Sequence, residues 1–130
     1  MRLFIVEDSI IMRNILQSML SDVSDVTLIG HAVDELGAIN NIDVLLPDVV
    51  ILDLNLEQGS GIGVLQHIKN KYHAAIKVMV LTNHTDDFYF NHCMKAGADY
   101  FFDKSFDFKL VRSALGNLAY INRIGKKFDA

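Results

Sequence analysis

The sequence predicts an α/β domain, a doubly wound parallel sheet of five strands with five helices. Short apolar runs alternate five times with longer stretches of helical periodicity, which is typical of parallel sheets with right-handed crossovers. The runs are continuously apolar, as expected for strands that are buried on both faces. Several of them end abruptly in polar residues, where a sheet of this class usually places its binding site.

Composition narrows the class of protein. A chain of 130 residues fits one domain, and we place it at residues 1–124, followed by a short tail at 125–130. The net charge is −4 with no basic run, so neither nucleic acid nor a membrane is expected as a direct partner. One cysteine, Cys93, excludes an internal disulfide and is interpreted as a small apolar helix residue. The early acids exclude a signal peptide, and a cytoplasmic protein is expected.

The first strand is expected at residues 3–6, and Asp8 and Ser9 are suited to cap a helix over 10–21. One arc of that helix is apolar and is formed by Ile11, Met12, Ile15, Leu16, Met19 and Leu20. Ile10 falls outside this arc. Two interpretations stay open: a core helix with one stray apolar residue, or a partner-docking rim near Ile10 and Ile11.

The remaining elements follow in alternation. Pro47 separates a helix from the central strand, since proline disfavours helix at the preceding residue, and Gly97 is suited to close a helix. The predicted strands are 26–30, 48–52, 76–81 and 100–102. The predicted helices are 34–46, 62–72, 86–95 and 107–124, with a loop at 59–61.

The central strand ends in Asp53. An ionised carboxylate within such an apolar run would be costly to bury, unless it lies at the carboxyl end of the strand. The first strand ends in Glu7 and Asp8, the fourth in Thr82, and the fifth leads to Lys104. Because these ends meet at one edge of the sheet, we interpret them as a magnesium-dependent site that accepts a phosphoryl group.

Each residue type suits this chemistry. Carboxylates in the first turn repel a phosphate and attract a hard cation such as Mg²⁺, where a dinucleotide-binding domain would have glycines. Asp53 is suited to attack phosphorus, while Lys104 and Thr82 are suited to contact phosphoryl oxygens. Taken singly, the acids also fit a solvated turn, Lys104 a surface lysine, and Thr82 a hydroxyl bonded to backbone.

The motifs in this order resemble the response-regulator receiver domain of two-component signalling, of the kind seen in chemotaxis regulators, over nearly the whole chain. They are Val6-Glu7-Asp8-Ser9, Pro47 to Asn55, Val80-Leu81-Thr82, and Ala96-Gly97-Ala98-Asp99-Tyr100 leading to Lys104. The resemblance implies the flavodoxin-like strand order 2-1-3-4-5. It also implies a signalling switch, not an enzyme, which catalyses only its own phosphorylation and slow dephosphorylation.

The resemblance further implies a role for each residue. Asp53 accepts the phosphoryl group from a phosphohistidine of a sensor histidine kinase or phosphotransfer protein. Glu7, Asp8, Asp53 and the backbone carbonyl of Asn55 bind Mg²⁺. The residues expected to contact the phosphoryl group are Thr82 and Lys104, those of the switch are Thr82 and Phe101, and the loop glycine is Gly61.

The chain departs from the family pattern at several places. Glu7 replaces the more usual aspartate. Ser105 follows Lys104 where proline is usual, often after a cis bond, so the geometry of the Lys104–Ser105 bond stays open. Asn83 replaces a small residue after Thr82, and with His84 it is expected to lie at the mouth of the site.

On a helical wheel Phe88 falls on the polar side of its helix, and an exposed aromatic side chain suggests a binding surface. The resemblance implies that the output face is formed by the fourth helix, the fifth strand and the fifth helix. We expect Phe88 and Phe101 to mark this face, used by a partner or for self-association. Two rivals stay open. One is a phosphorylation-independent interaction module of the same fold. The other is an aspartyl phosphatase of the haloacid dehalogenase type, which is disfavoured because Asn55 stands where that class has a second acid.

Overall fold

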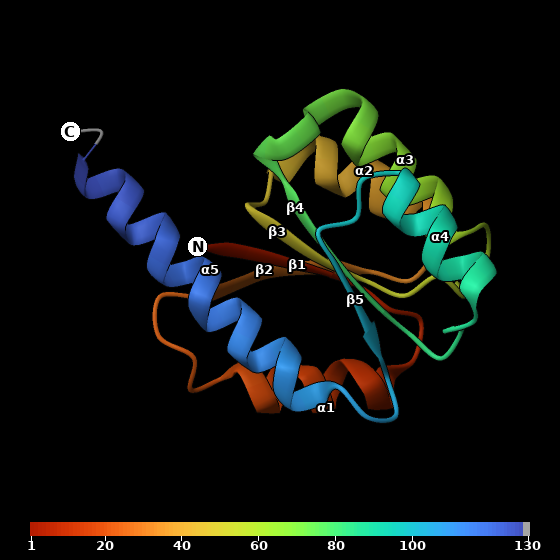
Figure 1. Ribbon diagram of the computed structural model, residues 1–130, viewed down its shortest axis with the longest axis horizontal. Coiled ribbons are helices and arrows are strands. Elements are labelled where there is room, and N and C mark those ends of the chain that lie inside the picture. Colours follow the sequence, from red (N-terminus) through yellow and green to blue (C-terminus); the bar gives the residue numbers. More distant parts are fainter. Residues whose placement is uncertain (129–130) are drawn as a thin grey trace.

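The computed structural model describes residues 1–128 and confirms the predicted architecture (Figure 1). Five parallel strands form one sheet in the order β2-β1-β3-β4-β5. The strands are β1 (Arg2–Val6), β2 (Thr27–Ala32), β3 (Val49–Leu52), β4 (Lys77–Thr82) and β5 (Tyr100–Asp103). The helices are α1 (Ile10–Leu20), α2 (Glu35–Leu45), α3 (Gly61–Tyr72), α4 (Asp87–Lys95) and α5 (Phe108–Phe128), with a 3₁₀ turn at His73–Ala75.

The helices cover both faces of the sheet, as Figure 1 shows: α1 and α5 lie on one face, and α2, α3 and α4 on the other. Successive residues of each central strand point to opposite faces, so β3 sends Val50 and Leu52 to one core and Val49 and Ile51 to the other. All four side chains are buried. This double burial is why the strand is continuously apolar.

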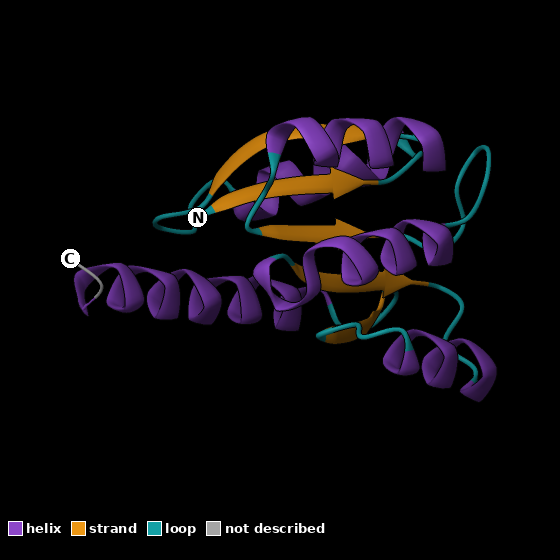
Figure 2. Ribbon diagram, turned by 90° about the horizontal axis from the view of Figure 1, so that it is seen from above, coloured by secondary structure: helices purple, strands orange, loops and turns teal. Residues whose placement is uncertain are grey.

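Four helices begin with a side-chain cap directly after a strand or loop at the carboxyl edge of the sheet. Ser9, Asp34, Ser60 and Asp86 each accept a hydrogen bond from a backbone N–H in the first turn. Such caps satisfy N–H groups that have no partner within the helix, each contributing roughly 1 kcal/mol. The strands all point towards this edge (Figure 2), so the capped turns frame it.

The predicted core arc of α1 is wrong at two positions. Leu16 and Leu20 are buried, but Ile11 is 73% exposed and Ile15 is 47% exposed. The predicted arc covered about half the helix, whereas a helix lying on one sheet face buries a stripe of roughly 100° or a little more. Ile10 is also exposed, and a partner-docking role for Ile10 and Ile11 stays a prediction.

The last helix is longer than expected. It runs past Ile124 and through Gly125 to Phe128, and in Figure 1 its second half extends beyond the sheet. The residues predicted to begin a tail at 125 are therefore helical as far as 128, while 129–130 lie outside the described residues. Within residues 1–128 no helix combines the length and apolar character needed to cross a bilayer.

Candidate functional site

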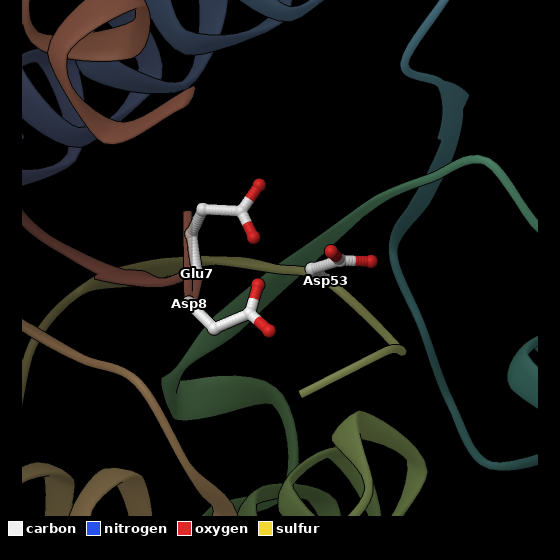
Figure 3. Close-up of side chains that lie close together, drawn as sticks. All are labelled: Glu7, Asp8 and Asp53. Atoms are coloured by element: carbon white, nitrogen blue, oxygen red, sulfur yellow. The ribbon is translucent and has the colours of Figure 1, made fainter. Parts of the chain in front are cut away.

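The pairing of β1 with β3 brings the three predicted acids together. Val6 lies opposite Leu52, and the N–H of Asp53 donates to the carbonyl of Val6 at 3.0 Å. The residues that follow these two strands are Glu7 and Asp8 after β1 and Asp53 after β3. Their side chains lie together at the carboxyl edge of the sheet (Figure 3). One carboxylate oxygen from each lies within 4.8 Å of the others.

The cluster is largely withdrawn from water. Glu7 is 2% exposed and Asp53 6%, whereas Asp8 is half-buried. The pKa of Glu7 is raised to about 7, chiefly by burial and also by the charge of Asp53, against the lowering effect of the adjacent Lys104. Oε1 of Glu7 has the Lys104 ammonium as an ion-pair partner. Among the residues that the structure describes, Oε2 has no hydrogen-bond partner, which is unusual for a buried acceptor oxygen.

Lys104 bridges two of the acids. Its Nζ lies 2.6 Å from Oδ2 of Asp53 and 2.5 Å from Oε1 of Glu7. Burial would lower the pKa of the Lys104 ammonium, but its contacts with Asp53 and Glu7 raise it. The ammonium therefore stays charged and faces the proposed acceptor, and the interpretation of Lys104 as a surface lysine is wrong.

The loop after β5 keeps Lys104 in place without proline. Lys104 donates its backbone N–H to the carbonyl of Thr82, and Ser105 donates to Oδ1 of Asp103 at 2.7 Å. Asp107 accepts from the N–H of Asp103 at 2.8 Å. The Lys104–Ser105 bond is trans, so the question left open by the sequence is answered.

Thr82 is fully buried at the end of β4, and its Oγ1 accepts a hydrogen bond from the N–H of His84 at 3.1 Å. The Thr82 hydroxyl is therefore bonded to backbone, which agrees with the simpler of the two interpretations of this residue. Asn83 and His84 are exposed directly after it. The ring of His84 packs on Tyr89 of α4, with 5.0 Å between centroids, which links this loop to α4.

The loop after β3 holds Asn55 close to Asp53. The N–H of Asn55 donates to Oδ1 of Asp53 at 3.2 Å, and Asn55 pairs with Ser60 in an antiparallel bridge. Gly61 donates its N–H to the carbonyl of Leu54 and lies against the Asp53 backbone, where a Cβ would come within 2.1 Å of the Asp53 carbonyl oxygen. The backbone around Asp53 thus has little room to vary.

The two aromatic residues predicted to mark an output face differ in exposure. Phe88 is 67% exposed on α4, as the helical wheel predicted. Phe101 is half-buried and packs edge to face against Phe90, with 5.3 Å between ring centroids. The ring of Phe101 therefore contacts Phe90 of α4, a contact that the sequence did not predict. Cys93 is buried and burial raises its pKa to about 11, as expected of an apolar helix residue.

The family pattern described as "Response regulator receiver domain" matches residues 3–116. The chain belongs to this family. A protein-glutamate methylesterase/protein-glutamine glutaminase from Methanospirillum hungatei is 31% identical over 121 residues, which cover 92% of this chain. The chain spans only 35% of that relative's length, and the match says nothing of this chain's activity.

Solved structures agree with the family. The response regulator domain of CheB from Thermotoga maritima has a TM-score of 0.78 and 26% identity, covering 92% of this chain and 93% of its own. The Mn²⁺-bound form of the response regulator Rcp1 has a TM-score of 0.74 and 25% identity, covering 90% of each chain. Receiver domains are mostly signalling switches and typically bind Mg²⁺ in an acidic pocket.

The residues of this chain fit such a cation. One carboxylate oxygen from each of Glu7, Asp8 and Asp53 lies within 4.8 Å of the others, and Oε2 of Glu7 is buried with no hydrogen-bond partner among the described residues. Carboxylate oxygens this close together suit Mg²⁺, which keeps several bound waters and needs only one or two carboxylate ligands. Asp8 and Asp53, with help from Glu7 and the Asn55 carbonyl, are the residues that would hold it.

We expect millimolar MgCl₂ to raise the melting temperature, because a ligand that binds only the folded state stabilises it and because the ionised acids repel one another without a cation. Asp8→Ala should abolish most of this increase. Differential scanning calorimetry with and without MgCl₂ measures both, with Asp87→Ala, an exposed acid of α4, as the control variant. Equal magnesium shifts in wild type and Asp8→Ala would place the cation elsewhere.

Proposed function

We propose that the domain is a phosphorylation switch in which Asp53 accepts a phosphoryl group from a histidine kinase or phosphotransfer protein. The observation that carries the proposal is the Lys104–Asp53 ion pair at 2.6 Å, set beside Glu7 and Asp8 at the carboxyl edge of the sheet. The Asp53 carboxylate is thereby held beside a buried ammonium group and close to two further acids. In this proposal the domain transfers the phosphoryl group to its own Asp53, and the output of the switch is contact with another protein.

The proposed step forms a bond between an Asp53 carboxylate oxygen and phosphorus while the phosphorus–nitrogen bond of the donor's phosphohistidine breaks. The leaving imidazole nitrogen takes a proton from solvent. Lys104 would balance negative charge on the phosphoryl oxygens, and the Asn55 N–H keeps the carboxylate oriented through Oδ1. Bound Mg²⁺ would supply further charge neutralisation, as in phosphoryl transfer generally.

A small phosphoryl donor such as acetyl phosphate tests the proposal without the cognate kinase. We expect one phosphoryl group per chain by intact mass in MgCl₂ and none in excess chelator. Steady turnover of a phosphate ester would instead support the aspartyl phosphatase. Absence of labelling over a wide range of donor and MgCl₂ concentrations would support the phosphorylation-independent module.

Asn83 and His84 are proposed to tune the lifetime of the phosphoryl group. Both are exposed beside Thr82, where a water must approach phosphorus for hydrolysis. The His84–Tyr89 packing restrains this opening. Replacing both residues by alanine should change the first-order loss of label severalfold, and an unchanged rate would mean that water access is set by other residues.

The output is proposed to run through Thr82 and Phe101 to the surface that contains Phe88. A phosphoryl oxygen that accepts from the Thr82 hydroxyl would draw this side chain away from the His84 N–H. The half-buried Phe101 ring would then have space to turn inward, away from Phe90. Full burial of such a ring is worth about 1.5–3 kcal/mol, which is the size of typical coupling between two sites.

Phe101→Ala should uncouple the switch and leave the site intact. We expect the variant to bind beryllium fluoride, a phosphoryl mimic, but to lose the mimic-induced change in self-association or partner affinity. Backbone amide NMR and sedimentation velocity provide the two readouts, and Met19→Ala, which truncates a partly buried side chain of α1 on the other face of the sheet, is the control. A full response in Phe101→Ala, with shifts confined to α1, would assign the output to the opposite face.

A further inference from the structure

Glu35, the first residue of α2, is joined to the loop between β3 and α3. Its Oε1 accepts a hydrogen bond from the N–H of Ser60 at 2.8 Å, and its own N–H donates to the carbonyl of Gln58 at 3.1 Å. Glu35 is half-buried. Two hydrogen bonds therefore tie the start of α2 to one short segment of the loop.

Two glycines make space for this side chain. A Cβ on Gly59 would lie 2.5 Å from the Cβ of Glu35, and a Cβ on Gly63 would lie 2.5 Å from its Oε2. Gly59 also has φ of +81°, a conformation that favours glycine. The cradle around the Glu35 carboxylate thus depends on the absence of side chains at both positions.

The segment held by Glu35 leads directly to the candidate site. Ser60 pairs with Asn55 in an antiparallel bridge, and the N–H of Asn55 donates to Oδ1 of Asp53 at 3.2 Å. The contacts run without a gap from Glu35 to Ser60, to Asn55 and to Asp53. A change in the position of Ser60 is therefore passed to the Asn55 backbone.

We propose that Glu35 is a positioning residue for the cation site: it fixes the β3–α3 loop so that the Asn55 carbonyl and the Asp53 carboxylate are already in place when Mg²⁺ binds. The inference rests on the proposed function, because it concerns the same site. A loop that is ordered beforehand need not lose conformational freedom on binding, which raises affinity. Glu35 acts through its acceptor oxygen and not through its charge.

Three variants separate these properties. Glu35→Ala removes the acceptor, Glu35→Gln keeps an acceptor oxygen but loses the charge, and Glu57→Gln removes the charge of an exposed acid in the same loop. Loss of one hydrogen bond typically changes an equilibrium by roughly two- to tenfold. We expect amide exchange at Ser60 to accelerate by about that factor in Glu35→Ala, and to stay near wild type in the other two.

The first readout is hydrogen–deuterium exchange over residues 55–60 in metal-free protein, which does not depend on phosphorylation. The second is the Mg²⁺ dissociation constant by isothermal titration calorimetry. We expect Mg²⁺ to bind severalfold more weakly to Glu35→Ala, with affinity recovered in Glu35→Gln. Unchanged exchange at Ser60 in Glu35→Ala would overturn the inference, and so would faster exchange with unchanged Mg²⁺ affinity.

Gly63→Ala tests the role of Glu35 independently. Alanine at this helical position should displace the flexible Glu35 carboxylate, so we expect faster exchange at Ser60 and weaker Mg²⁺ binding. In the Glu35→Ala background the same substitution should have no further effect on either, since the pair acts as a unit. Additive effects would contradict the assignment. Failure of wild type to bind Mg²⁺ would refute the proposed function. The hydrogen–deuterium exchange measurement would still decide whether Glu35 holds the loop.

Discussion

We expect Asp53→Asn to abolish labelling by acetyl phosphate in MgCl₂, whereas wild type should take up one phosphoryl group per chain. The amide has nearly the shape of the carboxylate but is a much weaker nucleophile towards phosphorus. Intact mass spectrometry measures the difference, and circular dichroism shows whether the variant is folded. We expect a folded variant, because substitution removes one of three neighbouring acids that disfavour each other's ionisation.

Glu57→Gln is the matched control, since it changes the same charge on an exposed side chain of the following loop. It should label like wild type. Normal labelling of Asp53→Asn would remove Asp53 from the role of acceptor. In that case the pairing of Lys104 with Asp53 would be an ordinary buried ion pair.

Gly61→Ala should have the second large effect, on stability and on the site together. A Cβ here would lie 2.1 Å from the carbonyl oxygen of Asp53 and 2.6 Å from Cα of Leu54. Both are backbone atoms, so no flexible side chain can move aside, and the end of β3 or the start of α3 must shift. Forced overpacking of this kind costs about 1–3 kcal/mol and occasionally more, and we expect labelling to fall with it.

Gly116→Ala is the control for this prediction. Gly116 lies within α5, and a Cβ there meets nothing within 4 Å. Alanine in a helix interior is favoured over glycine by about 0.5–1 kcal/mol, so this variant should be more stable than wild type. Urea denaturation compares the free energies of unfolding, and equal stability of the two variants would show that the close packing at Gly61 is unimportant.

The sequence predicted the sheet because each strand carries a local signature. A strand buried on both faces must be apolar throughout, as in β3, and a helix must follow each strand in a parallel sheet. The gathering of Glu7, Asp8 and Asp53 also followed from this topology, because strand ends meet at one edge. Gly61 was singled out by family resemblance, and the structure supplies the reason.

Other features depended on packing that no local pattern encodes. The exposure of Ile11 and Ile15 is set by how α1 lies on the sheet, and the partner of Phe101 by the placement of α4. Glu35 gave no signal, because an acid at the start of a helix is ordinary and favourable there. Only the folded chain brings it next to Ser60, at a separation of 25 residues.

The most direct test of the central claim is to locate the phosphoryl group by borohydride reduction. An acyl phosphate on an aspartate is reduced to the alcohol, which converts the labelled residue to homoserine. Peptide mass spectrometry of protein treated with acetyl phosphate and MgCl₂ should find homoserine at position 53 and aspartate at 8 and 48, with no conversion in chelator. Conversion at another acid, or labelled protein without conversion at 53, would contradict the account.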